Sequence, residues 1–96
     1  AQEIIYEKKL LDKFFERLGE KPDLVVYDEE GIRKAIQYGA VELLILSKKL
    51  NKTLSNELKK LAKSISSKIE IVSTDTTEGE QFYELSGMGA LLRFKV

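Results

Sequence analysis

The fold is decided by the end of the chain, Thr77–Val96, which reads TEGEQFYELSGMGALLRFKV. Thr77 and Glu80 have the spacing of a capping box, in which each side chain accepts a free backbone N–H at the start of a helix. The segment 87–89, Gly-Met-Gly, ends that helix, because glycine adopts the left-handed backbone angles of a tight reversal. The apolar residues that follow predict a strand, which must pair within a sheet formed earlier in the chain.

Side chains of this closing strand are expected to alternate between the two faces of the sheet. One face carries Ala90, Leu92, Phe94 and Val96. The other face carries Leu91, Arg93 and Lys95. The sequence therefore predicts an apolar core face and an opposite face with two cations, on which Arg93 points away from Leu92.

The chain before this end alternates between predicted helices and strands. The helices are Ile4–Leu18, the segment from its N-cap Asp28 to Gly39, and the segment from its N-cap Thr53 to Ile65. The strands are Asp23–Tyr27, Val41–Leu46 and Ile69–Val72. The complete order is α-β-α-β-α-β-α-β with short loops. This order predicts an α/β fold, a three-layer α/β/α sandwich in which helices cover both faces of a largely parallel sheet.

The first predicted helix has a wide apolar side. Its stripe consists of Ile4, Leu10, Leu11, Phe14, Phe15 and Leu18. Ile5 and Tyr6 lie outside this stripe, so the helix is expected to be buried on more than one side. The alternative is that part of Tyr6, Phe14 or Phe15 faces a partner protein.

Composition bounds the class of function. The chain has 96 residues, enough for one domain, and its 16 acidic and 16 basic residues leave no net attraction for nucleic acid or anionic membranes. Cysteine and histidine are absent, which excludes disulfides, thiolate metal sites and the commonest catalytic base. No apolar run approaches the roughly 20 residues of a membrane span. These absences fit an intracellular, cytoplasmic protein, for which we expect no metal or cofactor.

One group of lysines is the best candidate for contact with RNA or the ribosome. The group consists of Lys48, Lys49, Lys52, Lys59, Lys60 and Lys63. Clustered cations bind phosphate groups, but this cluster has no interleaved aromatic residues. A solvated helix surface is the alternative interpretation.

Two stretches of the chain resemble the C-terminal domain of archaeal and eukaryotic class-I peptide chain release factors. The first is Ile4–Leu18, IIYEKKLLDKFFERL, together with Ile36–Ile45, IQYGAVELLI. The second is EGEQF at 78–82 with GMGALLRF at 87–94. The resemblance covers nearly all 96 residues in order. The ribosome-rescue factor Pelota shares this domain, and the direct passage from Leu46 to Thr53, without an inserted minidomain, is similar to Pelota.

The resemblance implies a binding domain with no catalysis of its own. In this family the C-terminal domain docks a translational GTPase of the elongation factor 1-alpha type. The full-length protein also meets the ribosome and the recycling ATPase. Carried over to this chain, the docking residues are Phe14, Phe15, Leu91, Leu92, Arg93 and Phe94.

Three identities stay open at this point: a release factor, Pelota, and a kink-turn RNA-binding protein. The fold also resembles that of the kink-turn-binding ribosomal proteins. Those proteins have a Gly-x-Asn-Glu motif at the start of the helix that here begins at 28–31, Asp-Glu-Glu-Gly, and the asparagine is absent. We expect residues 1–96 to be one domain, monomeric in isolation, and the C-terminal part of a longer translation factor.

Overall fold

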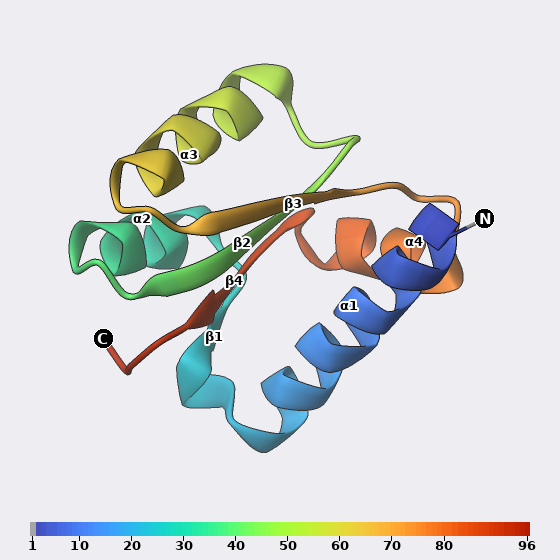
Figure 1. Cartoon of the computed structure of the whole chain (residues 1–96), viewed down its shortest axis with the longest axis horizontal. Helices are drawn as coiled ribbons and strands as arrows, with labels where there is room; N and C mark the ends of the chain where they lie inside the picture. Colours follow the sequence, from blue (N-terminus) through green and yellow to red (C-terminus); the bar gives the residue numbers. More distant parts are fainter. Residues whose placement is uncertain (1) are drawn as a thin grey trace.

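The computed structural model describes residues 2–96, in which a four-stranded sheet lies between two layers of helices (Figure 1). The elements are α1 (Gln2–Glu20), the 3₁₀ helix η1 (Pro22–Leu24), β1 (Val25–Val26), α2 (Glu29–Gln37), β2 (Val41–Ser47), α3 (Lys52–Ser64), β3 (Lys68–Val72), α4 (Thr77–Leu85) and β4 (Met88–Leu92). Helices α2 and α3 cover one face of the sheet, and α1 and α4 cover the other. The predicted α/β/α sandwich and its alternating order are confirmed.

The direction of the last strand differs from the prediction. The strand order is β1-β4-β2-β3, with β2 and β3 parallel. Strand β4 lies between β1 and β2 and runs antiparallel to both, with Ala90 opposite Leu44 and Leu91 opposite Val25. The expectation of a largely parallel sheet was therefore wrong. Gly87, with φ of 75°, reverses the chain directly after α4. Strand β4 then lies between β1 and β2, so that both of its edges are hydrogen-bonded to a neighbouring strand.

Strand β4 is also shorter and more deeply buried than expected. It begins at Met88, inside the predicted turn, and all five of its residues are buried. It ends at Leu92, which is opposite Val41, and the backbone N–H of Arg93 makes a last hydrogen bond to the Ala40 carbonyl at 2.7 Å. The prediction that Phe94 and Val96 share the core face was wrong, because the strand ends before them and both side chains are exposed.

Successive residues of β4 pack into two different cores. Ala90 and Leu92 contact the core beneath α2 and α3, to which Ile32 and Leu58 contribute. Leu91 belongs to the core beneath α1 and α4. The alternation predicted for this part of the strand is confirmed, with the difference that both faces are buried.

Two elements near the start of the chain have different ends from those predicted. Helix α1 passes through Gly19 and ends at Glu20, one residue beyond the glycine that was expected to stop it. The expected strand Asp23–Tyr27 is reduced to Val25–Val26. Its first part is the 3₁₀ helix η1, which has Pro22 in its first turn, where the missing backbone N–H of proline costs nothing.

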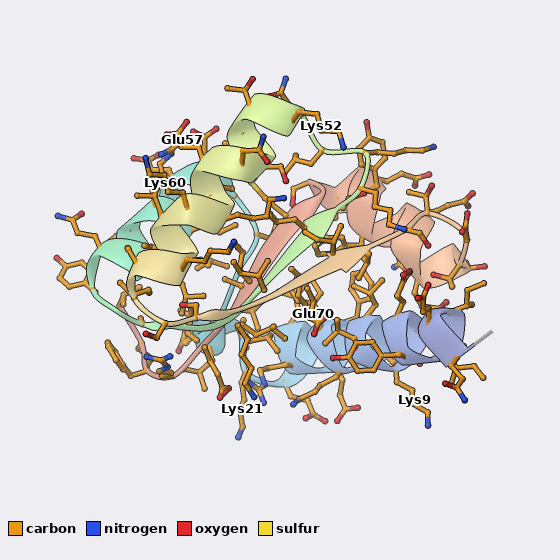
Figure 2. All side chains as sticks on the ribbon, turned by 45° about the horizontal axis from the view of Figure 1, so that its top comes forward. Lys9, Lys21, Lys52, Glu57, Lys60 and Glu70 are labelled. Carbon is orange, nitrogen blue, oxygen red and sulfur yellow. The ribbon has the colours of Figure 1, made fainter. Side chains whose placement is uncertain are left out.

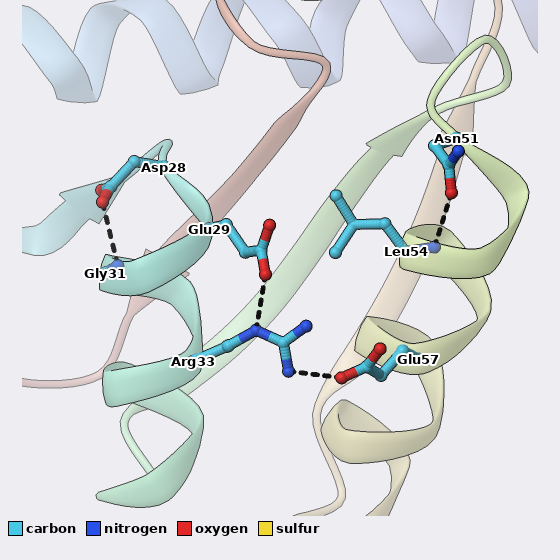
Figure 3. A network of polar contacts seen from close by, with 7 residues as sticks. All are labelled: Asp28, Glu29, Gly31, Arg33, Asn51, Leu54 and Glu57. Atoms are coloured by element: carbon cyan, nitrogen blue, oxygen red, sulfur yellow. Dashed lines mark hydrogen bonds and ion pairs between the residues drawn. The ribbon is translucent and has the colours of Figure 1, made fainter.

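The N-caps of the helices are partly those predicted. The Asp28 carboxylate accepts the N–H of Gly31 at 3.0 Å, as expected (Figure 3). In α4 the cap is Thr76, whose hydroxyl accepts the N–H of Gly79 at 2.8 Å, so the capping box at Thr77 was wrong. The cap has an extended backbone, while Thr77 is already the first helical residue.

Helix α3 is capped by Asn51 and not by Thr53. The Asn51 side-chain oxygen accepts the N–H of Leu54 at 3.0 Å (Figure 3), and Thr53 lies inside the helix. We expect Asn51→Ala to lower the free energy of unfolding by about 1 kcal/mol, because one N–H at the helix start loses its partner. Thr53→Ala is the matched control and should change stability by less than about 0.5 kcal/mol. Urea denaturation of both variants measures this, and equal losses would contradict the cap assignment.

Candidate partner-binding surfaces

Three of the six residues assigned to docking are inside the protein. Phe14, Leu91 and Leu92 are at most 3% exposed, so none of them can touch a partner directly. Leu91 and Leu92 also lie in the cores on opposite faces of the sheet. Phe15 is half-buried beside Phe14, with the two rings edge to face at 5.4 Å between centroids. These four residues can therefore contribute to docking mainly in an indirect way, by stabilising the fold that positions the exposed residues.

The two remaining docking candidates lie on the surface, in the tail that follows β4. Phe94 is 48% exposed, and the Arg93 side chain is exposed with one guanidinium nitrogen 3.5 Å from the Gly39 carbonyl oxygen. The Lys95 ammonium lies 3.1 Å from the Asp23 carboxylate, which anchors the tail near η1. The expected outward position of Arg93 is confirmed, and Arg93 and Phe94 are available for contact.

Further exposed apolar side chains lie on α1 and α4. They are Ile4, Ile5 and Tyr6 on α1 and Tyr83 and Leu85 on α4. The Lys8 ammonium lies 3.3 Å from the Glu78 carboxylate and links the two helices. The expectation that Ile5 and Tyr6 are buried on a second side of α1 was wrong, because both are more than half exposed. Their position outside the apolar stripe was the sequence signal for this exposure.

A groove of about 440 Å³ lies between the first half of α1 and strand β3. The Tyr6 hydroxyl donates a hydrogen bond to the Glu70 carboxylate at 3.0 Å. This bond raises the pKa of the Tyr6 phenol, because ionisation would remove the donor and place two negative charges together. The Glu7 carboxylate accepts both the backbone N–H and the hydroxyl of Ser73, at 2.9 and 2.7 Å. Sequence reasoning missed this groove, because its walls are far apart in the chain.

The six candidate lysines do not form one surface. Lys48 lines the groove beside α1, and the Lys49 ammonium lies 6.0 Å from the centre of the Tyr83 ring on α4. The other four lie on α3, where Figure 2 labels Lys52 and Lys60. Contact with RNA or the ribosome remains a prediction for either group.

The lysines of α3 line the side of the helix that faces away from the sheet. Lys52, Lys59 and Lys63 recur at a spacing that places them along one side of the helix. The one acidic residue of α3, Glu57, is engaged by Arg33 of α2 at 2.6 Å, and Arg33 also binds Glu29 (Figure 3). The hydrogen bond from the Arg33 guanidinium holds the pKa of Glu57 below its usual range.

The start of α2 is unsuited to binding phosphate. Asp28 caps the helix, and Glu29 and Glu30 lie in its first turn. A nucleic acid that approached this helix start would meet three carboxylates, so the structure gives no support there to the kink-turn alternative. Among residues 2–96, no cluster of acidic, histidine or cysteine side chains is arranged to hold a metal ion. No helix in the same range has the length and apolar character of a membrane span.

These features define a class of protein: a small α/β/α domain whose exposed apolar and charged side chains are suited to contact with other macromolecules. Within that class, the chain belongs to the family eRF1 domain 3, whose model matches residues 4–96. This family includes domains of peptide chain release factors and of Pelota. The resemblance inferred from the sequence motifs is therefore confirmed.

Two relatives represent the two branches of this family. A Pelota homologue of Pyrococcus horikoshii is 37% identical over 97 residues, which covers 97% of this chain and 27% of the relative. Peptide chain release factor subunit 1 of Pyrococcus abyssi is 30% identical over 141 residues, which covers 98% of this chain and 34% of the relative. The chain thus spans about a quarter to a third of the length of these relatives.

Two solved structures share the fold over nearly the whole chain. Archaeal Pelota, in a model of its ribosome-bound state with ABCE1, is 31% identical with a TM-score of 0.80 and covers 99% of this chain and 28% of its own. S. cerevisiae Dom34, described as a translation termination-like factor interacting with Hbs1, is 26% identical with a TM-score of 0.81. That match covers 95% of this chain and 27% of Dom34.

The lengths of the two alignments differ in an informative way. The release factor match spans 141 residues but contains only 98% of this 96-residue chain, or about 94 residues. About 47 positions of the release factor therefore have no counterpart here. The Pelota match spans 97 residues, so it contains no comparable number of positions without a counterpart in this chain. In this respect the chain is similar in length to the matched part of Pelota.

Proposed function

We propose that this domain docks a translational GTPase of the elongation factor 1-alpha type, as the C-terminal domain of a translation factor. The observation that carries the proposal is the match of the eRF1 domain 3 family to residues 4–96, together with the description of Dom34 as interacting with Hbs1. The domain acts by binding and contributes no catalysis. Exposed apolar side chains in the tail and on α1 and α4 support a protein partner more strongly than a small-molecule substrate.

The factor works on the ribosome in the cytoplasm, and its other domains supply the remaining contacts. Archaeal Pelota is described in a ribosome-bound state with ABCE1, which supports the ribosome and a recycling ATPase as further partners. The isolated domain is a monomer.

Two members of the family are candidates. The first is peptide chain release factor subunit 1, which directs translation termination at stop codons, and the motifs EKKLL and EGEQF are similar to it. The second is Pelota, which is favoured by the direct passage from Leu46 to Thr53 without an insertion and by the length of the alignment. Upstream coding sequence separates them: a Gly-Gly-Gln motif indicates a release factor, and an Sm-like N-terminal domain indicates Pelota.

Within the proposed docking surface, Arg93 and Phe94 make direct contact. Arg93 is suited to this because its guanidinium is exposed and only weakly held by the Gly39 carbonyl, 3.5 Å away. Exposed aromatic and arginine side chains are also the residue types that dominate binding energy at protein interfaces.

We expect Arg93→Ala to weaken GTPase binding by about 30-fold, or 2 kcal/mol, while leaving the unfolding temperature unchanged. Calorimetric titration with the archaeal elongation factor 1-alpha homologue, with and without GTP, measures this. Lys52→Ala is the control, since it removes an exposed cation from the start of α3, which follows the Ser47 end of β2 and not the Val41 end that pairs with Leu92. No binding by the folded wild-type domain would overturn the proposed function. If Arg93→Ala bound the GTPase as tightly as the wild-type domain, docking would stand but its assignment to the Arg93 surface would be wrong.

A further inference from the structure

We propose that the outer edge of β3 binds an extended, basic peptide segment of a partner protein, which adds to the sheet as a fifth strand. This inference goes beyond the proposed function and does not depend on it. It rests on a free sheet edge, on the direction of its backbone groups, and on the charge of the groove beside it.

Strand β3 is the only long edge of the sheet within residues 2–96. The strand order places β1 at one edge and β3 at the other, and β1 has only two residues while β3 has five. In Figure 2, β3 runs on the near side of the molecule between α3 and α1, and Glu70 is labelled between β3 and α1. An edge strand presents a row of unpaired backbone groups, which is a template for another strand.

The direction of these groups follows from two observed hydrogen bonds. The Val72 carbonyl accepts the N–H of Lys48, so the backbone groups of Val72 face β2. The N–H of the next residue, Ser73, faces the other way and is bound by Glu7 at 2.9 Å. Backbone groups alternate along a strand that pairs on one side, so the N–H and C=O groups of Ile69 and Ile71 also face outward. Glu7 occupies the Ser73 N–H at one end of the edge. The N–H and C=O groups of Ile69 and Ile71 remain free to pair with an added strand.

The groove beside this edge favours a cationic side chain. Val72 packs in the core beneath α1, so Glu70, two residues earlier, lies on the same side of the sheet. An added strand would direct every second side chain to that side and into the groove of about 440 Å³. The groups facing the groove are three carboxylates, from Glu3, Glu7 and Glu70, and one ammonium, from Lys48. A lysine or arginine of the peptide would therefore be attracted there, with the Tyr6 ring beside it.

A second copy of this chain is a poorer occupant of the same edge. If two copies paired antiparallel about the middle of β3, their Glu70 carboxylates would lie directly opposite each other. Like charges in directly opposed positions are destabilising. A peptide with cations at alternate positions has the complementary pattern, so the structure favours a basic partner segment over self-association.

The test uses the 96-residue domain and a capped synthetic peptide, TVKVRVT. We expect amide hydrogen exchange, followed by NMR, to slow at Ile69 and Ile71 when the peptide is added at up to about 1 mM. Two further peptides carry backbone N-methyl groups on alternate residues, either on the valines or on the basic residues. One of the two should lose binding and the other should keep it, because only one set of peptide N–H groups faces β3.

Charge is tested by a matched pair of variants. Glu70→Lys should weaken binding at least tenfold, by roughly 1.4 kcal/mol. Glu20→Lys makes the same change of net charge at the far end of α1 and should leave binding unchanged. The acidic peptide TVEVEVT should not bind. The proposal is overturned if TVKVRVT does not bind, if it binds without slowing exchange at Ile69 and Ile71, if the acidic peptide binds as well, or if sedimentation shows that the edge is occupied by a second copy.

Discussion

Phe14→Ala is expected to lower the free energy of unfolding by about 3–5 kcal/mol. Phe14 is fully buried at the centre of the core beneath α1 and α4. Its ring makes edge-to-face contacts with Phe15 and Phe82, at 5.4 and 5.3 Å between ring centres. Truncation removes both aromatic contacts and leaves a cavity beside Gly89, whose lack of a Cβ admits the Phe14 ring.

Chemical denaturation monitored by circular dichroism measures this loss, and Phe15→Ala is the control. Phe15 is only half-buried, so its truncation should cost clearly less than that of Phe14. The pair also separates folding from docking, since both residues were assigned to the docking surface. If Phe14→Ala cost less than about 1 kcal/mol, the core beneath α1 and α4 would be packed differently from the structure described.

Gly79→Ala is expected to destabilise the domain by about 2–3 kcal/mol, although alanine is the better helix former. A Cβ at Gly79 would collide with the backbone carbonyl oxygen of Ser73 and would lie 3.1 Å from the Thr76 hydroxyl that caps α4. The carbonyl belongs to the main chain and cannot rotate away, so α4 would have to move from the end of β3. The gain in helix propensity, about 1 kcal/mol, is smaller than the cost of that displacement.

Gly19→Ala is the matched control for this prediction. Gly19 also lies in a helix, but no atom lies within 4 Å of the position that its Cβ would take. This substitution should therefore stabilise the domain by about 0.5–1 kcal/mol, through the propensity gain and a less flexible unfolded chain. Thermal unfolding of the two variants would show opposite shifts of Tm. Stabilisation by both would mean that the approach of α4 to Ser73 is looser than the structure indicates.

The candidate docking residues could be named from the sequence, but their exposure could not. Leu91, Leu92, Arg93 and Phe94 form one continuous motif in the chain. In the folded protein the first two are buried and the last two are exposed. The change from buried to exposed residues occurs after Leu92, where the pairing of β4 with β2 ends. The position of that end depends on the lengths of the neighbouring strands. For the same reason, the six lysines looked like one cluster in the sequence and are divided between the α1 side of the sheet and α3.

The sequence by itself determined the layers of this domain, because helical and strand periods of apolar residues are local properties that set which side of each element is buried. It also determined the family, since the motifs near both ends of the chain were sufficient for that assignment. Only the tertiary structure decided the direction of β4, because alternation of helices and strands leaves open which gap in the sheet the last strand enters. The groove likewise exists only after folding, when Tyr6 and Glu70, which are 64 positions apart, come within 3.0 Å. Contacts of that kind depend on how layers pack together, and no local pattern in the chain encodes them.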